Sequence, residues 1–412
     1  MKEKNVLLDE VGLSIPTILL PNQGIDLEKW AVVACDQFTS EPEYWNKVEK
    51  LTDHLPSTFH IILPEVYLES PNKQERIDSI NQEMQHLLDG GSLVPSIDGF
   101  ILVQRTLKNG FVRNGLMVAL DLERYDFTSG SKAMIRATEK TVLERIPPRV
   151  QIRVNAPIEV PHIMVLFDDP SKSIIEPLCH LAEERAETLL YSTNLMLNGG
   201  SIKGYAISDK KWINQIAYGL SKIKKEDGFL FAVGDGNHSL ATAKQCWEDI
   251  KKDLSSQERE THPARYTLVE INNIFDDGLV FEPIHRVMFH IDREELLQFI
   301  SGDGPMVTVT MGDETKEIRL KKRNSHLEVG VLQLLLDDYL SLHPESKIDY
   351  IHGETSLRKL SSLPDSLGFL LSVMDKHELF TTVEMDGALP RKTFSMGEAE
   401  EKRYYMECRV IK

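Results

Sequence analysis

Cysteine is scarce and widely spaced in this sequence of 412 residues. The four cysteines, at positions 35, 179, 246 and 408, form no Cys-x-x-Cys pair, which argues against a zinc knuckle or a disulfide framework. No apolar run approaches the roughly 18 residues that would cross a bilayer. The first residues also lack the basic and apolar regions of a signal peptide. We therefore expect a reduced, cytoplasmic protein with no membrane partner.

Several short catalytic motifs are also missing. The sequence has no HExxH, which excludes a zincin, and no GxSxG nucleophile elbow. It has neither the GxxxxGK[ST] pattern of a P-loop nor the glycine spacing of a dinucleotide fingerprint. Any nucleotide site must therefore be built in another way.

Positive charge is in deficit. Lysine and arginine number 47 against 64 aspartate and glutamate residues, and the net charge is -17. So acidic a surface repels duplex DNA and anionic lipid, so we expect no nucleic-acid partner. The hydrophobic share of 41% and the length allow a large buried core in two or three domains.

Predicted strands and helices are mixed without a strict strand–helix–strand order. This mixture predicts an α+β (mixed α/β) fold with a mixed sheet as its core. We expect a main domain over residues 1–290 and a smaller α+β region over 291–385, where the strands become shorter. A C-terminal segment, 386–412, is expected to pack back on the main domain.

The stretch FLFAVGDGNHSLATAKQCWEDI, residues 229–250, predicts a buried strand, a turn and a helix. Gly234 and Gly236 permit positive φ and a close approach of the backbone. Amide groups of residues 236–239, at the positive end of the helix dipole, would form an anion site. His238 could donate to a phosphate oxygen or move a proton, and Asp235 could orient it or bind a metal.

The same turn has a simpler interpretation. Asp235 or Asn237 could be only a helix cap, with His238 on the surface and Ser239 in an ordinary first turn. A strand–turn–helix pattern of this length does not decide between the two readings.

Residues 132–153 are basic in an acidic chain, with six cationic side chains against two glutamates. We predict a helix that ends near Ile146, before Pro147-Pro148, followed by a strand over 150–154. Lys132, Arg136 and Lys140 would then share one helix face and could converge on a phosphate. A solvated face with local ion pairs is the alternative.

Two further segments carry candidate residues. WAVVACDQF, 30–38, predicts a buried strand that delivers Asp36 to a polar loop, where it could act as a general base or a Mg²⁺ ligand. Near the C-terminus, Arg391, Lys392 and Thr393 could clamp phosphate. Helix capping and a solvated loop, respectively, are the alternatives.

Seven quoted segments together resemble a bacterial and archaeal family, the domain of unknown function 1015, over nearly the whole chain. They are ACDQFTSEPEYW, RATEKT, PHIMVLFDDP, GDGNHSLATAK, HPARYTLVEINNI, FEPIHRV and LPRKTFSMGEAEEKRYY. The family's turn usually reads Asp-Gly-His-His-Arg, whereas this chain has Asn237 and Ser239 in place of one His and the Arg. The departure removes a guanidinium from the turn, for which Arg136, Lys140 or Lys392 would have to compensate.

The turn also resembles the phosphate-binding element of the ParB/sulfiredoxin superfamily, which includes kinases of free serine. This resemblance implies a nucleotide such as ATP or ADP, Mg²⁺, and phosphoryl transfer to or from a small hydroxylated metabolite like serine. Sulfiredoxin chemistry needs a cysteine in the turn, which is absent, and a DNA clamp is disfavoured by charge. A non-catalytic nucleotide sensor and a phosphatase remain alternatives, and the oligomeric state is left open.

Overall fold

The computed structural model describes residues 5–39, 41–139 and 146–412, and they form two compact units. Unit 1 comprises residues 1–137, 141–279 and 398–412, and unit 2 comprises 138–140 and 280–397. The boundaries therefore lie at 279/280 and 397/398, and differ from the expected positions near 290 and 385. Residues 281–289 form a strand of unit 2, and only the last 15 residues return to unit 1.

A mixed ten-stranded sheet forms the centre of unit 1, which confirms the mixed α/β fold class. Its strand order is β10-β11-β4-β5-β13-β9-β12-β7-β6, with β1 beside β5. The strands β13–β9, β12–β7 and β6–β7 pair in parallel and the other pairs are antiparallel. The strands are β1 (Leu13–Ser14), β4 (Phe100–Thr106), β5 (Val112–Asp121), β6 (Tyr125–Asp126), β7 (Ile135–Ala137), β9 (Met164–Phe167), β10 (Leu189–Asn194), β11 (Ser201–Ile207), β12 (Phe231–Asp235) and β13 (Tyr266–Asn273).

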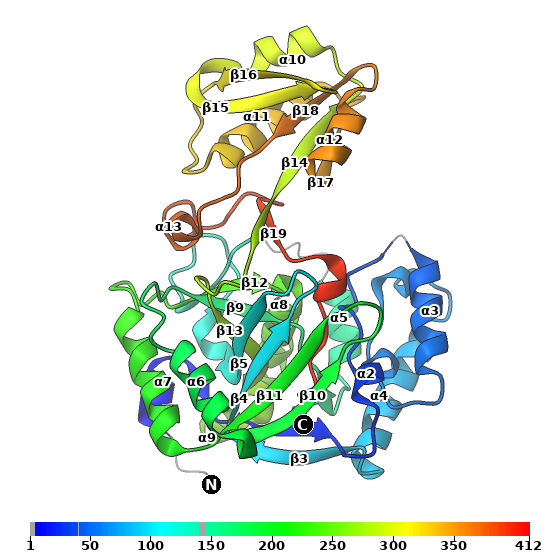
Figure 1. Cartoon of the computed structure of the whole chain (residues 1–412), viewed down its shortest axis with the longest axis vertical. Coiled ribbons are helices and arrows are strands. Elements are labelled where there is room, and N and C mark those ends of the chain that lie inside the picture. Colours follow the sequence, from blue (N-terminus) through cyan, green and yellow to red (C-terminus); the bar gives the residue numbers. More distant parts are fainter. Residues whose placement is uncertain (1–4, 40, 140–145) are drawn as a thin grey trace. The chain divides into compact units, whose positions relative to one another are not determined.

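Helices cover both faces of this sheet, so the central strands are buried on both sides (Figure 1). One face packs against α6, α7 and α8, and the other against α2, α4 and the C-terminal segment. The helices of unit 1 are α1 (Val6–Glu10), α2 (Leu27–Trp30), α3 (Pro42–Thr52), α4 (Lys73–Asp89), α5 (Ile146–Arg153), α6 (Glu176–Glu184), α7 (Lys210–Ile223), α8 (Asn237–Ile250) and α9 (Ser256–Thr261). Two small pairs, β2 (Thr17–Pro21) with β3 (Leu93–Asp98) and β8 (Ile158–Glu159) with β20 (Arg409–Val410), complete the unit.

Unit 2 has a second sheet, ordered β16-β15-β18-β14-β17, with β19 also paired to β14. Helices α10 and α11 pack on one cluster of its apolar side chains, and α12 packs on another. The elements are β14 (Phe281–Phe289), α10 (Arg293–Ile300), β15 (Ser301–Met311), β16 (Glu314–Leu320), α11 (Glu328–Leu342), β17 (Lys347–His352), α12 (Glu354–Ser361), β18 (Ser366–Leu370), α13 (Lys376–Asp386) and β19 (Phe394–Met396).

Two local predictions are wrong. Residues 135–137 form a strand and 146–153 a helix, the reverse of the expected order. The physical reason is that Pro147 and Pro148 lie in the first turn of α5, where a missing amide hydrogen costs nothing. The segment 30–38 is no strand either, since α2 ends at Trp30 and only Val33 makes an isolated bridge, to Arg403.

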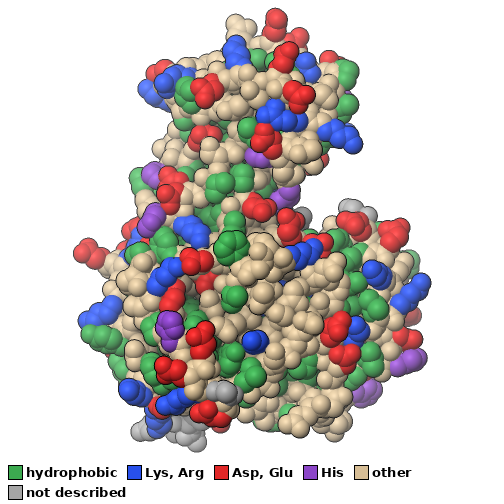
Figure 2. Space-filling view, viewed as in Figure 1, with side chains coloured by type: hydrophobic (Ala, Val, Ile, Leu, Met, Phe, Trp, Pro, Cys, Tyr) green, Lys and Arg blue, Asp and Glu red, His purple; other side chains and the backbone are tan. Residues whose placement is uncertain are grey.

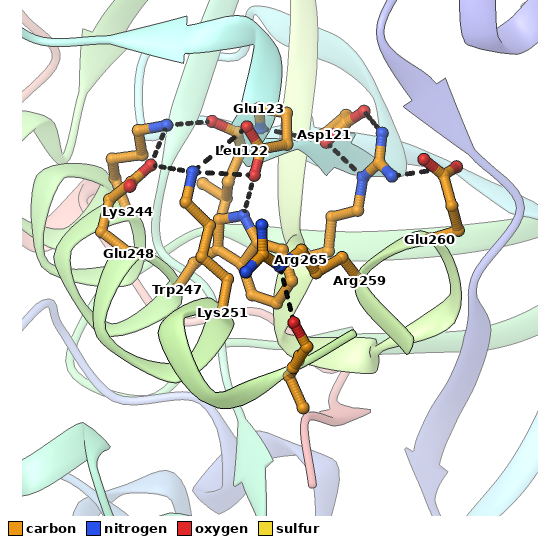
Figure 3. A network of polar contacts seen from close by, with 11 residues as sticks. Asp121, Leu122, Glu123, Lys244, Trp247, Glu248, Lys251, Arg259, Glu260 and Arg265 are labelled. Carbon is orange, nitrogen blue, oxygen red and sulfur yellow. Dashed lines mark hydrogen bonds and ion pairs between the residues drawn. The ribbon is translucent and has the colours of Figure 1, made fainter. Parts of the chain in front are cut away.

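A polar network anchors α8 to the sheet far from its first turn (Figure 3). The Trp247 indole donates to the Glu123 carboxylate at 2.6 Å, and the Lys251 ammonium lies 3.0 Å from the same carboxylate. Nearby, Arg265 makes a two-pronged contact with Asp121, at 3.0 and 2.8 Å. These contacts hold the C-terminal part of α8 against the sheet. The N-terminal turn of α8 is not part of this network, and it lies beside the cavity described below.

The visible surface mixes charges of both signs. On the face shown in Figure 2, acidic and basic side chains of the described residues are interspersed, without a broad region of either sign. No helix within the described part of the chain is long and apolar enough to cross a membrane.

Candidate functional site

The first turn of α8 follows directly from the end of β12, as the glycine pattern predicted. Gly236 is the N-cap of α8, adopts φ 80° and provides no side-chain cap. A Cβ at this position would lie 3.1 Å from the Cα of Ile163. Glycine is therefore required both by the left-handed backbone and by the close approach of the neighbouring chain. The positive end of the helix dipole faces this turn.

Asp235 ends β12 and lies beside a lysine from the C-terminal segment. One carboxylate oxygen accepts a hydrogen bond from the Gly236 amide at 2.8 Å, and the other lies 3.6 Å from Lys402 Nζ. Lys402 was not among the cations expected to compensate for the missing arginine of the turn. It places an ammonium group next to the helix start.

A histidine that the sequence analysis did not single out lies at the same place. His162 Nε2 is 2.8 Å from the Ser239 hydroxyl, and its ring meets the edge of Tyr404 at 5.0 Å between centroids. His162 precedes β9 in the quoted segment PHIMVLFDDP, so its only sequence signal was membership of that segment. Ser239 thus has a defined partner within the site.

Asp36 is electrostatically coupled to this group. Burial alone would raise the pKa of Asp36, but His162, a hydrogen bond from Gln37 and the charge of Lys402 together lower it. The Gln37 amide donates to Asp36 at 3.0 Å. Asp36 is therefore an ionised carboxylate near His162 and Lys402, and the segments around 36 and 235 meet within unit 1.

A cavity of about 140 Å³ opens beside the first turn of α8. Helix α5, β8, the segment 61–68 and the chain before β9 enclose it. Its polar lining residues include His162, Ser239, Thr242, Cys35 and Tyr404. Burial raises the pKa of the Cys35 thiol to about 11, with a further contribution from Asp36, so this thiol is a poor nucleophile at neutral pH.

The charged groups of the cavity wall are paired with one another. Arg149 contacts Glu65, and Arg153 Nη2 lies 2.5 Å from Glu159. Glu159 also accepts hydrogen bonds from the Thr267 hydroxyl at 2.9 Å and the Leu268 amide at 2.8 Å. Burial would raise the pKa of Glu159, but Arg409 and Arg153 hold it below its usual value.

The predicted cations lie elsewhere or outside the described residues. Arg136 lies on β7, not on a helix, and its guanidinium is 2.6 Å from Asp227 and over the ring of Phe229. It is only 2% exposed, so it serves as an internal ion pair. Lys140 lies outside the described residues.

The predicted C-terminal phosphate clamp belongs to unit 2. Arg391 Nη2 lies 3.0 Å from Asp337. The Thr393 hydroxyl donates to the Pro390 carbonyl at 2.6 Å, and Lys392 adopts a left-handed backbone with φ 56°. These contacts of the loop lie within unit 2.

The other predicted residues of the turn do not line the cavity. Gly234 is part of β12, and neither Asn237 nor His238 lines the cavity. The His238 carbonyl accepts a hydrogen bond from Thr242 at 2.7 Å. Of the two candidate histidines near the helix start, His162 is therefore the one that faces the cavity.

No group of three or more His, Cys, Asp or Glu side chains able to hold a metal occurs within the described residues. Mg²⁺ commonly takes one or two carboxylates and completes its shell with water and substrate phosphates.

Comparison with solved structures gives distant matches. A free serine kinase variant in complex with ADP is 11% identical, with a TM-score of 0.38, and the match covers 72% of this chain and 91% of that one. SbnI from Staphylococcus aureus, with a C-terminal truncation, is 10% identical at TM-score 0.35, covering 68% and 82%. A conserved hypothetical protein from Pyrococcus furiosus is 11% identical at TM-score 0.34, covering 68% and 90%. Similarity at this level bears on neither substrate nor mechanism.

No curated protein matches the chain at a significant level. A family model does match, over residues 19–361, which is most of the sequence and includes β12, the turn and α8. The chain therefore belongs to the family described as protein of unknown function (DUF1015).

Proposed function

We propose that this protein is a nucleotide-dependent phosphotransferase that acts on a small hydroxylated metabolite. One observation carries the proposal. A lysine, two carboxylates and a histidine–serine pair gather at the uncapped start of α8, directly beside a cavity. An ammonium and helix amides suit phosphate oxygens, and a histidine suits the proton of a hydroxyl group.

The residues divide between binding and proton transfer. The amides of residues 237–239 and the ammonium of Lys402 would hold the phosphates of ATP or ADP. Asp235 would hold Mg²⁺, which supplies charge neutralisation for the phosphates when bound. His162 would accept the proton of the substrate hydroxyl, and Asp36 would stabilise the resulting imidazolium.

A non-catalytic nucleotide sensor is the competing hypothesis. A sensor needs the phosphate contacts but no proton acceptor at the cavity. The 2.8 Å contact between His162 and Ser239, with both residues in the cavity wall, favours an enzyme over a sensor. A phosphatase would use the same groups with water in place of the acceptor.

Ligand-induced shifts in melting temperature provide the test of binding. ATP, ADP, CTP and phosphoserine are added singly, with and without Mg²⁺, to the full chain and to Asp235→Asn. At least one nucleotide should raise the melting temperature of the wild type by several degrees, because ligand binding stabilises the folded state. The gain from Mg²⁺ should be lost in the variant.

Phosphorus NMR on any nucleotide that binds then tests turnover. Transfer to a hydroxyl group supports the phosphotransferase, release of inorganic phosphate alone supports the phosphatase, and binding without turnover supports the sensor. If no nucleotide shifts the melting temperature at millimolar concentration, the proposal is wrong.

A further inference from the structure

The cavity beside α8 is lined mainly by aliphatic side chains. These come from the segment 61–68, from α4 and α5, and from the chain that leads through β8 to β9. Among the aliphatic lining residues are Ile61, Leu63, Met84, Ile152, Ala156 and Ile158. Such a wall stabilises an apolar ligand by removing its surface from water.

The charged side chains in the wall are paired with one another, so they offer few counter-charges to an ionic ligand. Arg149 is engaged with Glu65, and Arg153 with Glu159. Glu159 also takes the Arg409 guanidinium at 2.8 Å and two further hydrogen bonds. Transferring an ion from water into such a wall without a counter-charge is strongly unfavourable. Both the ammonium and the carboxylate of free serine would be desolvated in this cavity without a free counter-charge.

Uncharged polar groups line the part of the cavity next to the helix start. His162 Nε2 and the Ser239 hydroxyl lie 2.8 Å apart there, and Thr242 is one turn further along α8. This end adjoins the helix start, where the phosphates are proposed to bind. A hydroxyl group at this end would have hydrogen-bonding partners, while the remainder of the ligand would lie among apolar side chains.

We infer that the cavity receives an uncharged alcohol with an aliphatic body, whose hydroxyl group lies at the His162–Ser239 end. The inference rests on the proposed function and names its substrate class. Apolar cavities of about 150 Å³ accommodate a six-carbon molecule such as benzene. This cavity, at about 140 Å³, therefore matches an alcohol of about five or six carbon atoms.

Phosphoryl transfer to the alcohol would form one phosphorus–oxygen bond and break another. The alcohol oxygen bonds to the terminal phosphorus of the nucleoside triphosphate, and the bond from that phosphorus to the bridging oxygen breaks. The nucleoside diphosphate leaves with the bond electrons, and the hydroxyl proton passes to His162 Nε2. The products are a phosphate monoester and the diphosphate.

The first experiment compares acceptors with Mg²⁺–ATP, measuring ADP release and the phosphate monoester by phosphorus NMR. Hexan-1-ol and 3-methylbutan-1-ol should show kcat/KM at least tenfold above that of L-serine. A preference for serine would overturn the inference and leave the phosphotransferase intact. Binding of an alcohol without phosphoryl transfer would support the ligand class and overturn the phosphotransferase.

The second experiment reduces the cavity. Ala156→Leu adds three carbon atoms to the wall and should lower kcat/KM for hexan-1-ol at least fivefold relative to a two-carbon alcohol. Val154→Leu is the matched control, because Val154 is 48% exposed and does not line the cavity. Both variants are first checked for an unchanged melting transition. If Ala156→Leu does not fold, the melting temperature of the wild type with hexan-1-ol is the test. Binding in the cavity should raise that temperature, and no increase would overturn the inference.

The same titration tests what else the cavity could hold. If hexan-1-ol and ATP compete for binding, the cavity takes the nucleobase and the inference is overturned. Independent binding of the two supports it.

Discussion

At the scale of single residues, the site depends on side chains that reach α8 from distant parts of the chain. His162 meets Ser239 across 77 positions, and Lys402 comes from the C-terminal segment to Asp235. Sequence pattern indicated Asp235 and the glycine turn, because a strand end and glycines are local signals, whereas Asp36 was proposed from a strand that does not form. It could not predict His162 or Lys402, because only the folded chain makes them neighbours.

Lys402→Met tests the cation at this site. Removing a charged partner of a phosphate should weaken nucleotide binding about tenfold, equivalent to roughly 1.4 kcal/mol. Isothermal titration calorimetry with Mg²⁺–ADP measures the change. Lys252→Met is the matched control, since Lys252 pairs with Asp249 at 2.6 Å near the other end of α8 and is well exposed. Equal affinities of Lys402→Met and the wild type would remove Lys402 from the site.

Glu407 should make the stability of the protein depend on pH. Burial raises its pKa from 4.5 to about 7, a hydrogen bond from Tyr191 opposes the shift, and Glu270 adds to it. Between these two values the folded state binds a proton that the unfolded state lacks, so this contribution to stability is lost as pH rises towards 7.

Glu407→Gln removes that titration and keeps the shape of the side chain. Relative to the wild type, the variant should gain about 1–3 kcal/mol in free energy of unfolding between pH 5 and pH 8. Urea unfolding at both pH values measures the gain. A difference between the proteins that does not change with pH would show that Glu407 does not titrate in this range.

At the scale of elements, the start of α8 depends on a glycine that satisfies two separate requirements. Gly236→Ala places a Cβ at positive φ and 3.1 Å from the Ile163 backbone. Gly228→Ala meets only the first condition, since Gly228 has φ 88° and nothing within 4 Å of its Cβ position. Each variant should lose about 1 kcal/mol from backbone strain.

Gly236→Ala should lose roughly a further 1 kcal/mol from the contact with Ile163, and it should also weaken nucleotide binding. Chemical denaturation and calorimetry on both variants test this. Identical losses in the two variants would mean that the approach of Ile163 does not constrain the turn.

Some helices and strands agree with the sequence-based predictions and others do not. The continuous apolar run before and within β12 and the apolar face of α8 predicted the strand–turn–helix correctly. The basic stretch was predicted in reverse. The pair Pro147-Pro148 is compatible with the end of a helix, but prolines fit equally well in the first turn of one, where they lie in α5. Local sequence alone does not distinguish these two uses.

At the scale of the whole molecule, unit 1 is discontinuous in sequence. Its last segment, residues 398–412, follows unit 2 along the chain. Residues 398–412 add β20 beside β8, and Tyr405, Met406 and Cys408 join its apolar core. The expected return of the C-terminus was placed too early, at 386, because residues 386–397 read no differently from those after them. Their pairing partners, such as Pro283 for Phe394, are distant in sequence.

The central claim is that phosphate oxygens bind at the start of α8, between Lys402 and the cavity. A crystal structure of the full chain with Mg²⁺ and a non-hydrolysable ATP analogue tests it most directly. The account predicts phosphate oxygens within about 3.2 Å of first-turn amides and of Lys402 Nζ. Well-ordered nucleotide bound elsewhere, with the first turn of α8 making no phosphate contact, would contradict it.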